Sequence, residues 1–212
     1  MNRISTITML AVMAALLATI GDMMLLVAAN HVSGSGIAPP IAPNWVRLGG
    51  AAGVIAIPFY AIGYNKAAML LSRRSGQTER WIRMLGICIG MVGACIHLLT
   101  ALRISNVLDR SWEYEGLFTV LVGDDRTLAA MWGFVLVAGT VASVIFARQV
   151  RRMPDVPRYV AWLNPALMTA AITIAVMPVA TDYWYLVPAA PNLAHAIFFF
   201  ACVMGEKHPA RI

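Results

Sequence analysis

Three ionisable residues stand inside long apolar stretches of this sequence, where such side chains are costly to keep. Asp22 interrupts the apolar run from Ile7 to Ala29, and His97 and His195 lie in two later runs. An ionisable group inside a membrane usually faces the interior of the helix bundle and often serves function. Asp22, His97 and His195 are therefore the candidate catalytic residues.

The chemistry that these side chains suit is proton transfer. A carboxylate opposite one or two imidazoles can do acid–base work, because one group gives a proton while another takes one. In a pocket open to lipid the natural substrates are lipids or isoprenoids, and isomerisation, cyclisation and hydrolysis all fit. Asp22 would be the general acid or a charge stabiliser, with His97 and His195 as the base and its partner.

Polar and aromatic residues elsewhere in the sequence are candidates for substrate binding. Asn192 precedes His195 by three residues and so shares its helical face, where it could orient the substrate. Thr19 and Thr100 each lie one turn from an ionisable residue and could fix its orientation. The candidate substrate-binding residues are Asn192, Tyr60, Trp132, Trp184 and Thr100.

Other kinds of site and function fit parts of the same pattern. Two histidines and a carboxylate suit a catalytic zinc ion with an open position, but the sequence has no HxxxH or HExxH. We expect no cofactor, with zinc as the alternative. The alternative function is a non-catalytic binder or transporter of a small amphiphile. A third is a small subunit whose polar groups only tie helices together.

The rest of the sequence predicts the helices that must position these residues. Hydrophobic residues make up 60% of the 212 residues and charged residues 12%, against about 45–50% and 25% in soluble domains. Six apolar blocks are long enough to cross a hydrocarbon core of about 30 Å. In lipid, helices and closed barrels alone satisfy their own backbone, and the blocks lack a barrel's alternation. We predict an all-α, six-transmembrane-helix bundle, a single membrane domain over residues 1–212, with helices at 6–29, 46–72, 80–104, 127–149, 158–179 and 188–205.

Basic residues predict the orientation of this bundle, because they gather on the cytoplasmic side. With both termini cytoplasmic, twelve of the sixteen Lys and Arg residues face inward. This pattern is typical of a multi-pass protein of a bacterial inner membrane. The net charge of +6 belongs to that inner surface and predicts no nucleic-acid partner. The expected partners are the bilayer and a lipid or isoprenoid, with a homo-oligomer as a further option.

The predicted helices bring the three ionisable residues to one depth. Each lies about seven residues from the outer end of its helix, which is about 10 Å at 1.5 Å per residue. A proton or ion pathway would instead need polar groups across the whole bundle. The outer loop at 105–126 could add a short interfacial helix or lid over Trp112 to Val122.

Several smaller features predict how the helices pack. The glycines in "GGAAG" (49–53) and "GICIGMVGAC" (86–95) have spacings that let helices approach closely. The pair Asn164-Pro165 is expected to kink the fifth helix. Lys66, near the inner end of the second helix, is expected to extend its amine to the interface.

Five segments together resemble an uncharacterised family of small six-helix bacterial membrane proteins, a domain of unknown function. They are "GDMMLL" (21–26), "IPFYAIGY" (57–64), His97, "VPRYVAWLNPAL" (156–167) and "PNLAHAIFFF" (191–200). The resemblance implies the six-helix topology and a shared polar pocket involving Gly21, Asp22, His97 and Asn192. It implies no activity.

Two further families are similar in more limited ways. Membrane-embedded terpene cyclases are similar in their small size and buried acids. Zinc-dependent lipid hydrolases of the ceramidase type look similar in using His and Asp near a membrane face. The present chain lacks the paired helical histidines of those hydrolases.

Overall fold

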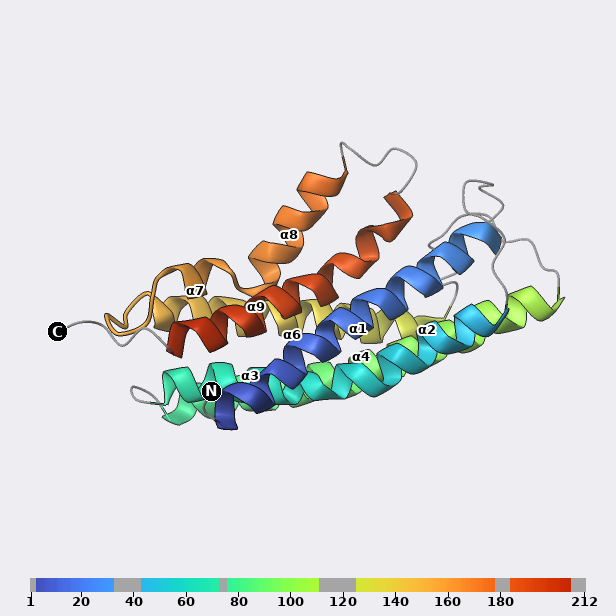
Figure 1. Ribbon diagram of the computed structural model, residues 1–212. Helices are drawn as coiled ribbons and strands as arrows, with labels where there is room; N and C mark the ends of the chain where they lie inside the picture. The colour runs from blue at the N-terminus through green and yellow to red at the C-terminus, as the bar shows by residue number, and fades with distance from the viewer. Residues whose placement is uncertain (1–2, 33–42, 73–75, 111–124, 178–183, 207–212) are drawn as a thin grey trace.

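The computed structural model describes residues 3–32, 43–72, 76–110, 125–177 and 184–206. Within those ranges the regular elements are all helices (Figure 1). In chain order they are α1 (Arg3–Val32), α2 (Pro43–Ala56), the 3₁₀ turn η1 (Ile57–Phe59), α3 (Tyr60–Leu71), α4 (Gly76–Arg110), α6 (Arg126–Val150), α7 (Tyr159–Trp162), α8 (Pro165–Val176), the 3₁₀ turn η2 (Trp184–Ala189) and α9 (Ala190–Glu206). The predicted all-α fold is confirmed for these residues.

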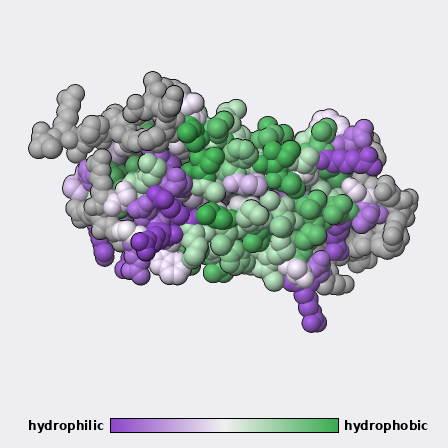
Figure 2. Space-filling view, turned by 90° about the horizontal axis from the view of Figure 1, so that it is seen from below, coloured by the Kyte–Doolittle hydropathy of each residue, from purple (hydrophilic) through white to green (hydrophobic). Residues whose placement is uncertain are grey.

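The outside of the bundle is apolar over its middle. Figure 2 shows a broad hydrophobic band between hydrophilic ends. Large apolar side chains are exposed on the helices, including Ile87, Val137 and Ile174, the last with 69% of its surface exposed. Five helical segments are long and apolar enough to cross a membrane: Thr6–His31, Asn44–Leu71, Gly76–Val107, Arg126–Val150 and Val187–Gly205. The structure therefore indicates a multi-pass membrane protein.

The block predicted as one helix over 158–179 is instead broken into α7 and α8. Pro165 has no backbone N–H to donate and opens a new helix, as proline does at a first position. Asn164 caps that helix: its Oδ1 accepts from the Leu167 N–H, and its Nδ2 donates to the Ala161 carbonyl. The kink expected at Asn164-Pro165 is thus a break between two helices. With 12 residues, α8 is about 18 Å long at 1.5 Å per residue.

The block predicted over 46–72 is one continuous path made of α2, η1 and α3. Pro58 lies in the middle of it and tightens the backbone into a 3₁₀ turn, because proline cannot donate the hydrogen bond that an α-helix needs there. The Tyr60 N–H bonds back to the Ile57 and Pro58 carbonyls. This turn sets the direction in which Tyr60 and the rest of α3 face the core.

Glycines let the helices approach closely, as their spacing predicts. A Cβ added to Gly21 of α1 would lie 2.7 Å from the Gly49 carbonyl oxygen of α2. A Cβ on Gly86 of α4 would lie 2.2 Å from the Cβ of Tyr64 in α3. These contacts draw α1, α2, α3 and α4 together around the middle of the bundle.

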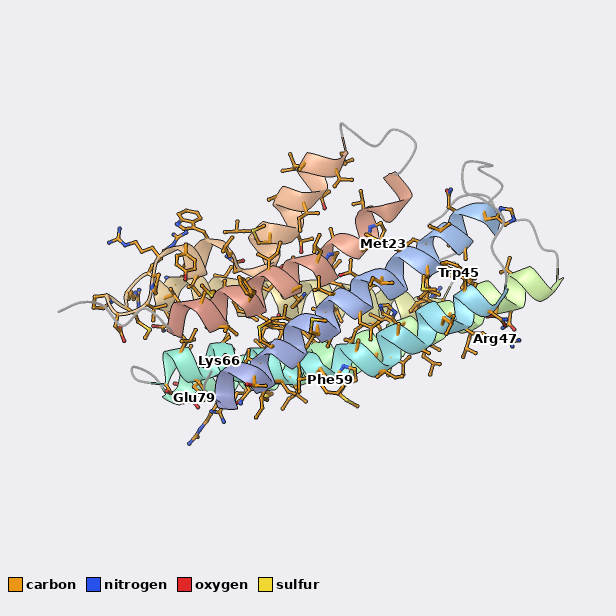
Figure 3. The ribbon with its side chains drawn as sticks, in the orientation of Figure 1. Met23, Trp45, Arg47, Phe59, Lys66 and Glu79 are labelled. Carbon is orange, nitrogen blue, oxygen red and sulfur yellow. The ribbon has the colours of Figure 1, made fainter. Side chains whose placement is uncertain are left out.

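Charged side chains mark the two ends of the bundle (Figure 3). Arg47 and Trp45 lie toward one end, while Glu79 lies toward the other, near the start of α1 and the end of α9. The prediction that Lys66 reaches the interface is wrong, because Lys66 is only 2% exposed. Lys66 lies on the part of α3 that faces the core of the bundle, and its neighbours Ala67 and Ala68 are buried as well.

Candidate functional site

The carboxylate of Asp22 joins three helices in the middle of the bundle. Its Oδ1 accepts a hydrogen bond from His97 Nε2 of α4 at 2.8 Å. Its Oδ2 accepts from Asn192 Nδ2 of α9 at 2.5 Å. The Asp22 and His97 side chains are 14% and 7% exposed, so this acid–base pair is largely removed from solvent. Both carboxylate oxygens of Asp22 therefore have hydrogen-bond partners, which offset the cost of burying this residue.

Asn192 passes the network on to α3. Its Oδ1 accepts from the Tyr60 hydroxyl at 2.6 Å, while its Nδ2 donates to Asp22. An amide offers one acceptor and one donor group side by side, so the two bonds together fix which way round it lies. Tyr60 is 1% exposed, so its hydroxyl and ring lie in the interior of the bundle.

His195 lies one turn after Asn192 but belongs to a second chain of hydrogen bonds. The Pro191 carbonyl, which can only accept, lies 2.7 Å from His195 Nδ1, so this nitrogen carries a proton. His195 Nε2 lies 2.9 Å from the Tyr64 hydroxyl and, in the neutral ring, accepts from it. The imidazole also packs on the Tyr60 ring, with centroids 4.8 Å apart and planes tilted by 30°.

A glycine of α2 makes room for His97. A Cβ added to Gly53 would lie 1.8 Å from His97 Nδ1, so any other residue would push the imidazole aside. Within the described part of the chain, this buried Nδ1 has no hydrogen-bond partner. The imidazole is therefore positioned by its bond to Asp22 and by its close packing against the backbone at Gly53.

The polar groups face a small cavity of about 50 Å³. Residues of all five candidate spans line it. The polar and aromatic lining residues are Asp22, Tyr60, His97, Trp132, Asn192 and His195, and the others are Ile57, Ile89, Gly93, Ile96, Val135, Pro188 and Pro191. A water molecule needs about 10–15 Å³ of such space. The cavity thus fits a few waters or one small polar group, not a whole lipid.

Most of the predicted site residues meet at this cavity, and two do not. Asp22, His97, His195, Asn192, Tyr60 and Trp132 all line it. Thr100 is buried but lies outside the lining. The Thr19 hydroxyl bonds to the Ala15 carbonyl of its own helix at 2.8 Å rather than orienting Asp22. The side chain of Trp184 and the predicted lid over Trp112 to Val122 lie outside the described residues.

The positions of Asp22, His97 and His195 do not match the three-ligand zinc site that the sequence offers as an alternative. Among the described residues, no three His, Cys, Asp or Glu side chains converge as a metal site would require. Asp22 and His97 are in direct contact, while both ring nitrogens of His195 are engaged by Tyr64 and Pro191. The arrangement therefore offers a carboxylate–imidazole pair, a group that suits proton transfer.

Sequence reasoning missed Tyr64 and Gly53 as parts of the site. Tyr60 and Tyr64 are one turn apart, as are Asn192 and His195, so two matched pairs could have been read from the spacing. The spacing of Gly53 in "GGAAG" predicts helix packing alone. Its second role depends on which residue of α4 lies opposite, and the sequence does not carry that information.

An apolar multi-helix bundle around a buried carboxylate–imidazole pair defines the class: a multi-pass membrane protein, helical throughout its described regular elements, with a polar site among its candidate membrane spans. The chain belongs to a family of unknown function (DUF6796), whose profile matches residues 1–207. This confirms the predicted membership of an uncharacterised family. No curated protein and no solved structure matches the chain.

Proposed function

We propose that this protein is a membrane-embedded enzyme that uses Asp22 and His97 for acid–base chemistry on a lipid or isoprenoid. The reaction would be an isomerisation, cyclisation or hydrolysis. The observation that carries the proposal is the 2.8 Å contact between Asp22 Oδ1 and His97 Nε2 on the wall of a cavity inside the candidate spans. A carboxylate and an imidazole in contact can exchange a proton as a reacting group gains or loses one.

The neighbouring residues would serve this pair in different ways. Asn192 holds the second oxygen of Asp22 and, through Tyr60, keeps the carboxylate turned toward His97. His195 would act through its packing on Tyr60, because its own nitrogens are engaged elsewhere. We therefore assign proton transfer to Asp22 and His97, and positioning to His195, Asn192 and Tyr60.

The cavity would admit only the reacting end of the substrate. Its volume of about 50 Å³ is well below the 300–1,000 Å³ that encloses a drug-sized ligand. Trp132 and Val135 bring α6 to the cavity, and their neighbours Phe134 and Val137 point outward, 43% and 65% exposed. An apolar tail could thus remain in the lipid beside α6 while its end reaches Asp22.

We further propose a six-pass topology in a bacterial inner membrane, with both termini cytoplasmic and the site in the outer half of the bilayer. In this arrangement α7 and α8 together make the fifth pass, although α8 alone is short. The basic loops support the orientation. Epitopes at both termini should resist protease added to spheroplasts, from which the outer membrane has been removed, and become accessible after lysis. Digestion of one terminal epitope in intact spheroplasts would mean an odd number of passes.

Labelling of single cysteines offers an independent check of the same topology. A membrane-impermeant maleimide should label Thr127→Cys in intact cells, but not Ser72→Cys or Arg151→Cys, and all three native positions are exposed. The unmodified chain is the control, because its cysteines Cys88, Cys95 and Cys202 lie within helices. Labelling of Arg151→Cys from outside would contradict the orientation.

The enzyme proposal is tested with purified protein in lipid nanodiscs. Polyprenols, polyprenyl diphosphates, diacylglycerol and ceramide are each supplied, and the recovered lipid is analysed by chromatography, mass spectrometry and NMR, because an isomer keeps its mass. We expect one class to be converted by the wild type and not by Asp22→Asn.

Thr140→Ala is the matched control, because the Thr140 hydroxyl is exposed, bonds to the Leu136 carbonyl of its own helix and lies outside the cavity lining. It should convert lipid as the wild type does. Full activity in Asp22→Asn would remove Asp22 from the mechanism. A lipid that is bound and recovered unchanged would identify a non-catalytic binder.

A further inference from the structure

The cavity lining also indicates what kind of group the site accepts. Resting on the proposed function, we infer that the substrate is an apolar alcohol, whose uncharged hydroxyl enters the cavity, and that phosphate and diphosphate head groups are excluded. The inference rests on three features of the lining: its charges, an unsatisfied donor and its size.

The charges disfavour an anion. The described residues that line the cavity include one carboxylate, Asp22, and no Lys or Arg. A phosphate would have to leave water and face that carboxylate with no fixed cation beside it. Charge repulsion is strong where the surroundings are of low dielectric, and an unpaired charge is costly to bury.

A cationic head group is also disfavoured. Each oxygen of Asp22 already accepts a hydrogen bond, one from His97 and one from Asn192. An ammonium group would lose its own hydration on entering, and this carboxylate, which two donors already share, would compensate for only part of that cost. A neutral group can add to the network without displacing either residue, because each carboxylate oxygen has a second lone pair.

Trp132 supplies the second feature. Its indole Nε1 is buried and, in the described part of the chain, has no hydrogen-bond partner. Indole N–H can only donate, and a buried donor left unsatisfied is unusual in a native protein. Trp132 and Asp22 both line the cavity, and a hydroxyl can accept from an indole N–H and donate to a carboxylate, whereas a hydrocarbon can do neither.

The third feature is the size and polarity of the space. About 50 Å³ suits a hydroxyl and the first carbons of a chain, while the apolar lining residues Ile57, Ile89 and Val135 suit those carbons. The hydroxyl of the alcohol would donate its hydrogen bond to Asp22 of the Asp22–His97 pair. The site would thus bind the hydroxyl of the alcohol at the group that the proposed function makes its acid–base centre.

The test compares ligands that differ only in the head group. Tritiated geranylgeraniol is bound to the protein in neutral phosphatidylcholine nanodiscs, and competition is measured with unlabelled geranylgeraniol, geranylgeranyl diphosphate and geranylgeranylamine at equal mole fractions. We expect the alcohol to compete at least tenfold better than either charged analogue.

Trp132→Phe should weaken binding of the alcohol by about threefold to tenfold, which is what one hydrogen bond contributes. Trp81→Phe, the same change at a tryptophan of α4 that is 49% exposed and outside the cavity lining, is the control and should leave binding unchanged. Equal or tighter binding of the diphosphate, unchanged affinity in Trp132→Phe, or binding of none of the three would overturn the inference.

The outcome is separable from that of the enzyme proposal. Preferential binding of the alcohol with no product would remove the enzyme proposal and keep this inference. Conversion of a diphosphate that depends on Asp22 would do the reverse.

Discussion

The hydroxyl of Tyr60 donates to Asn192 Oδ1 at 2.6 Å, while the Nδ2 of the same amide donates to Asp22. If the amide turned over, its oxygen would face an acceptor oxygen of Asp22, and the Tyr60 hydroxyl would have to change from donor to acceptor. Tyr60 therefore helps to hold the carboxylate in position without touching it. The consequence is that residues of α3 and α9 set the geometry of a pair that belongs to α1 and α4.

Tyr60→Phe should destabilise the protein and disturb Asp22. The buried Asn192 Oδ1 would lose its donor, at a cost of about 1–3 kcal/mol in the free energy of unfolding. We also expect slower turnover, because Asn192 would be free to turn away from Asp22. Equilibrium unfolding in mixed detergent and the conversion assay measure the two effects.

Tyr64→Phe is the matched control for this change. It removes a similar bond, to His195 Nε2 at 2.9 Å, from the same helix face, but leaves the bonds of Asp22 intact. It should cost similar stability and leave most of the activity. Equal activity losses in the two variants would show that Tyr60 has no specific connection to Asp22.

The two histidines should differ in their effects on rate. His97→Gln removes the imidazole that bonds to Asp22 and should lower the rate by about 10²–10⁴, the usual contribution of a general acid or base. His195→Gln should lower it less than tenfold and keep the shape of the pH–rate profile. Rates measured across pH for both variants check this. A new profile shape in His195→Gln would make His195 a catalytic residue.

The cap of α8 is a separate, structural prediction. Asn164→Ala should destabilise the protein by about 0.5–2 kcal/mol, as loss of an N-cap usually does, and it leaves the Leu167 N–H without its acceptor. Hydrogen exchange should quicken in the first turn of α8. Asn164→Ser keeps a capping acceptor without placing a carboxylate oxygen against the Ala161 carbonyl, and it should restore slow exchange at Leu167. Unchanged exchange in Asn164→Ala would mean that packing alone holds this end.

Much of the fold could be predicted because lipid imposes a simple rule: long apolar blocks become helices. The helices α1, α4 and α6 contain the blocks predicted at 6–29, 80–104 and 127–149. The predicted block 158–179 differs because Pro165 and the cap at Asn164 end one helix and begin another. Hydropathy registers the apolar character of that block but does not register a lost backbone donor.

The sequence allowed us to predict which residues gather at the cavity, but not which of them bond to one another. The cost of burying a charge made Asp22, His97 and His195 stand out, and Asn192 followed from helical spacing. Which of them touch depends on the rotation of each helix about its axis. That rotation is set by contacts such as Gly21 with Gly49, which one sequence does not pair. His195 therefore looked equivalent to His97, although its nitrogens bond to Tyr64 and Pro191.

Gly53→Ala tests whether the space beside His97 matters for function. The added Cβ would lie 1.8 Å from His97 Nδ1, so the imidazole or α2 must move, at a cost of about 1–3 kcal/mol for overpacking. We expect the bond to Asp22 to lengthen and turnover to fall more than tenfold while the protein still folds. The ¹⁵N chemical shifts of the His97 ring report the bond directly. Gly139→Ala, where an added Cβ would have no neighbour within 4 Å among the described residues, is the control. Wild-type shifts and turnover in Gly53→Ala would show that α2 yields without disturbing the site, and Gly53 would then serve helix packing alone.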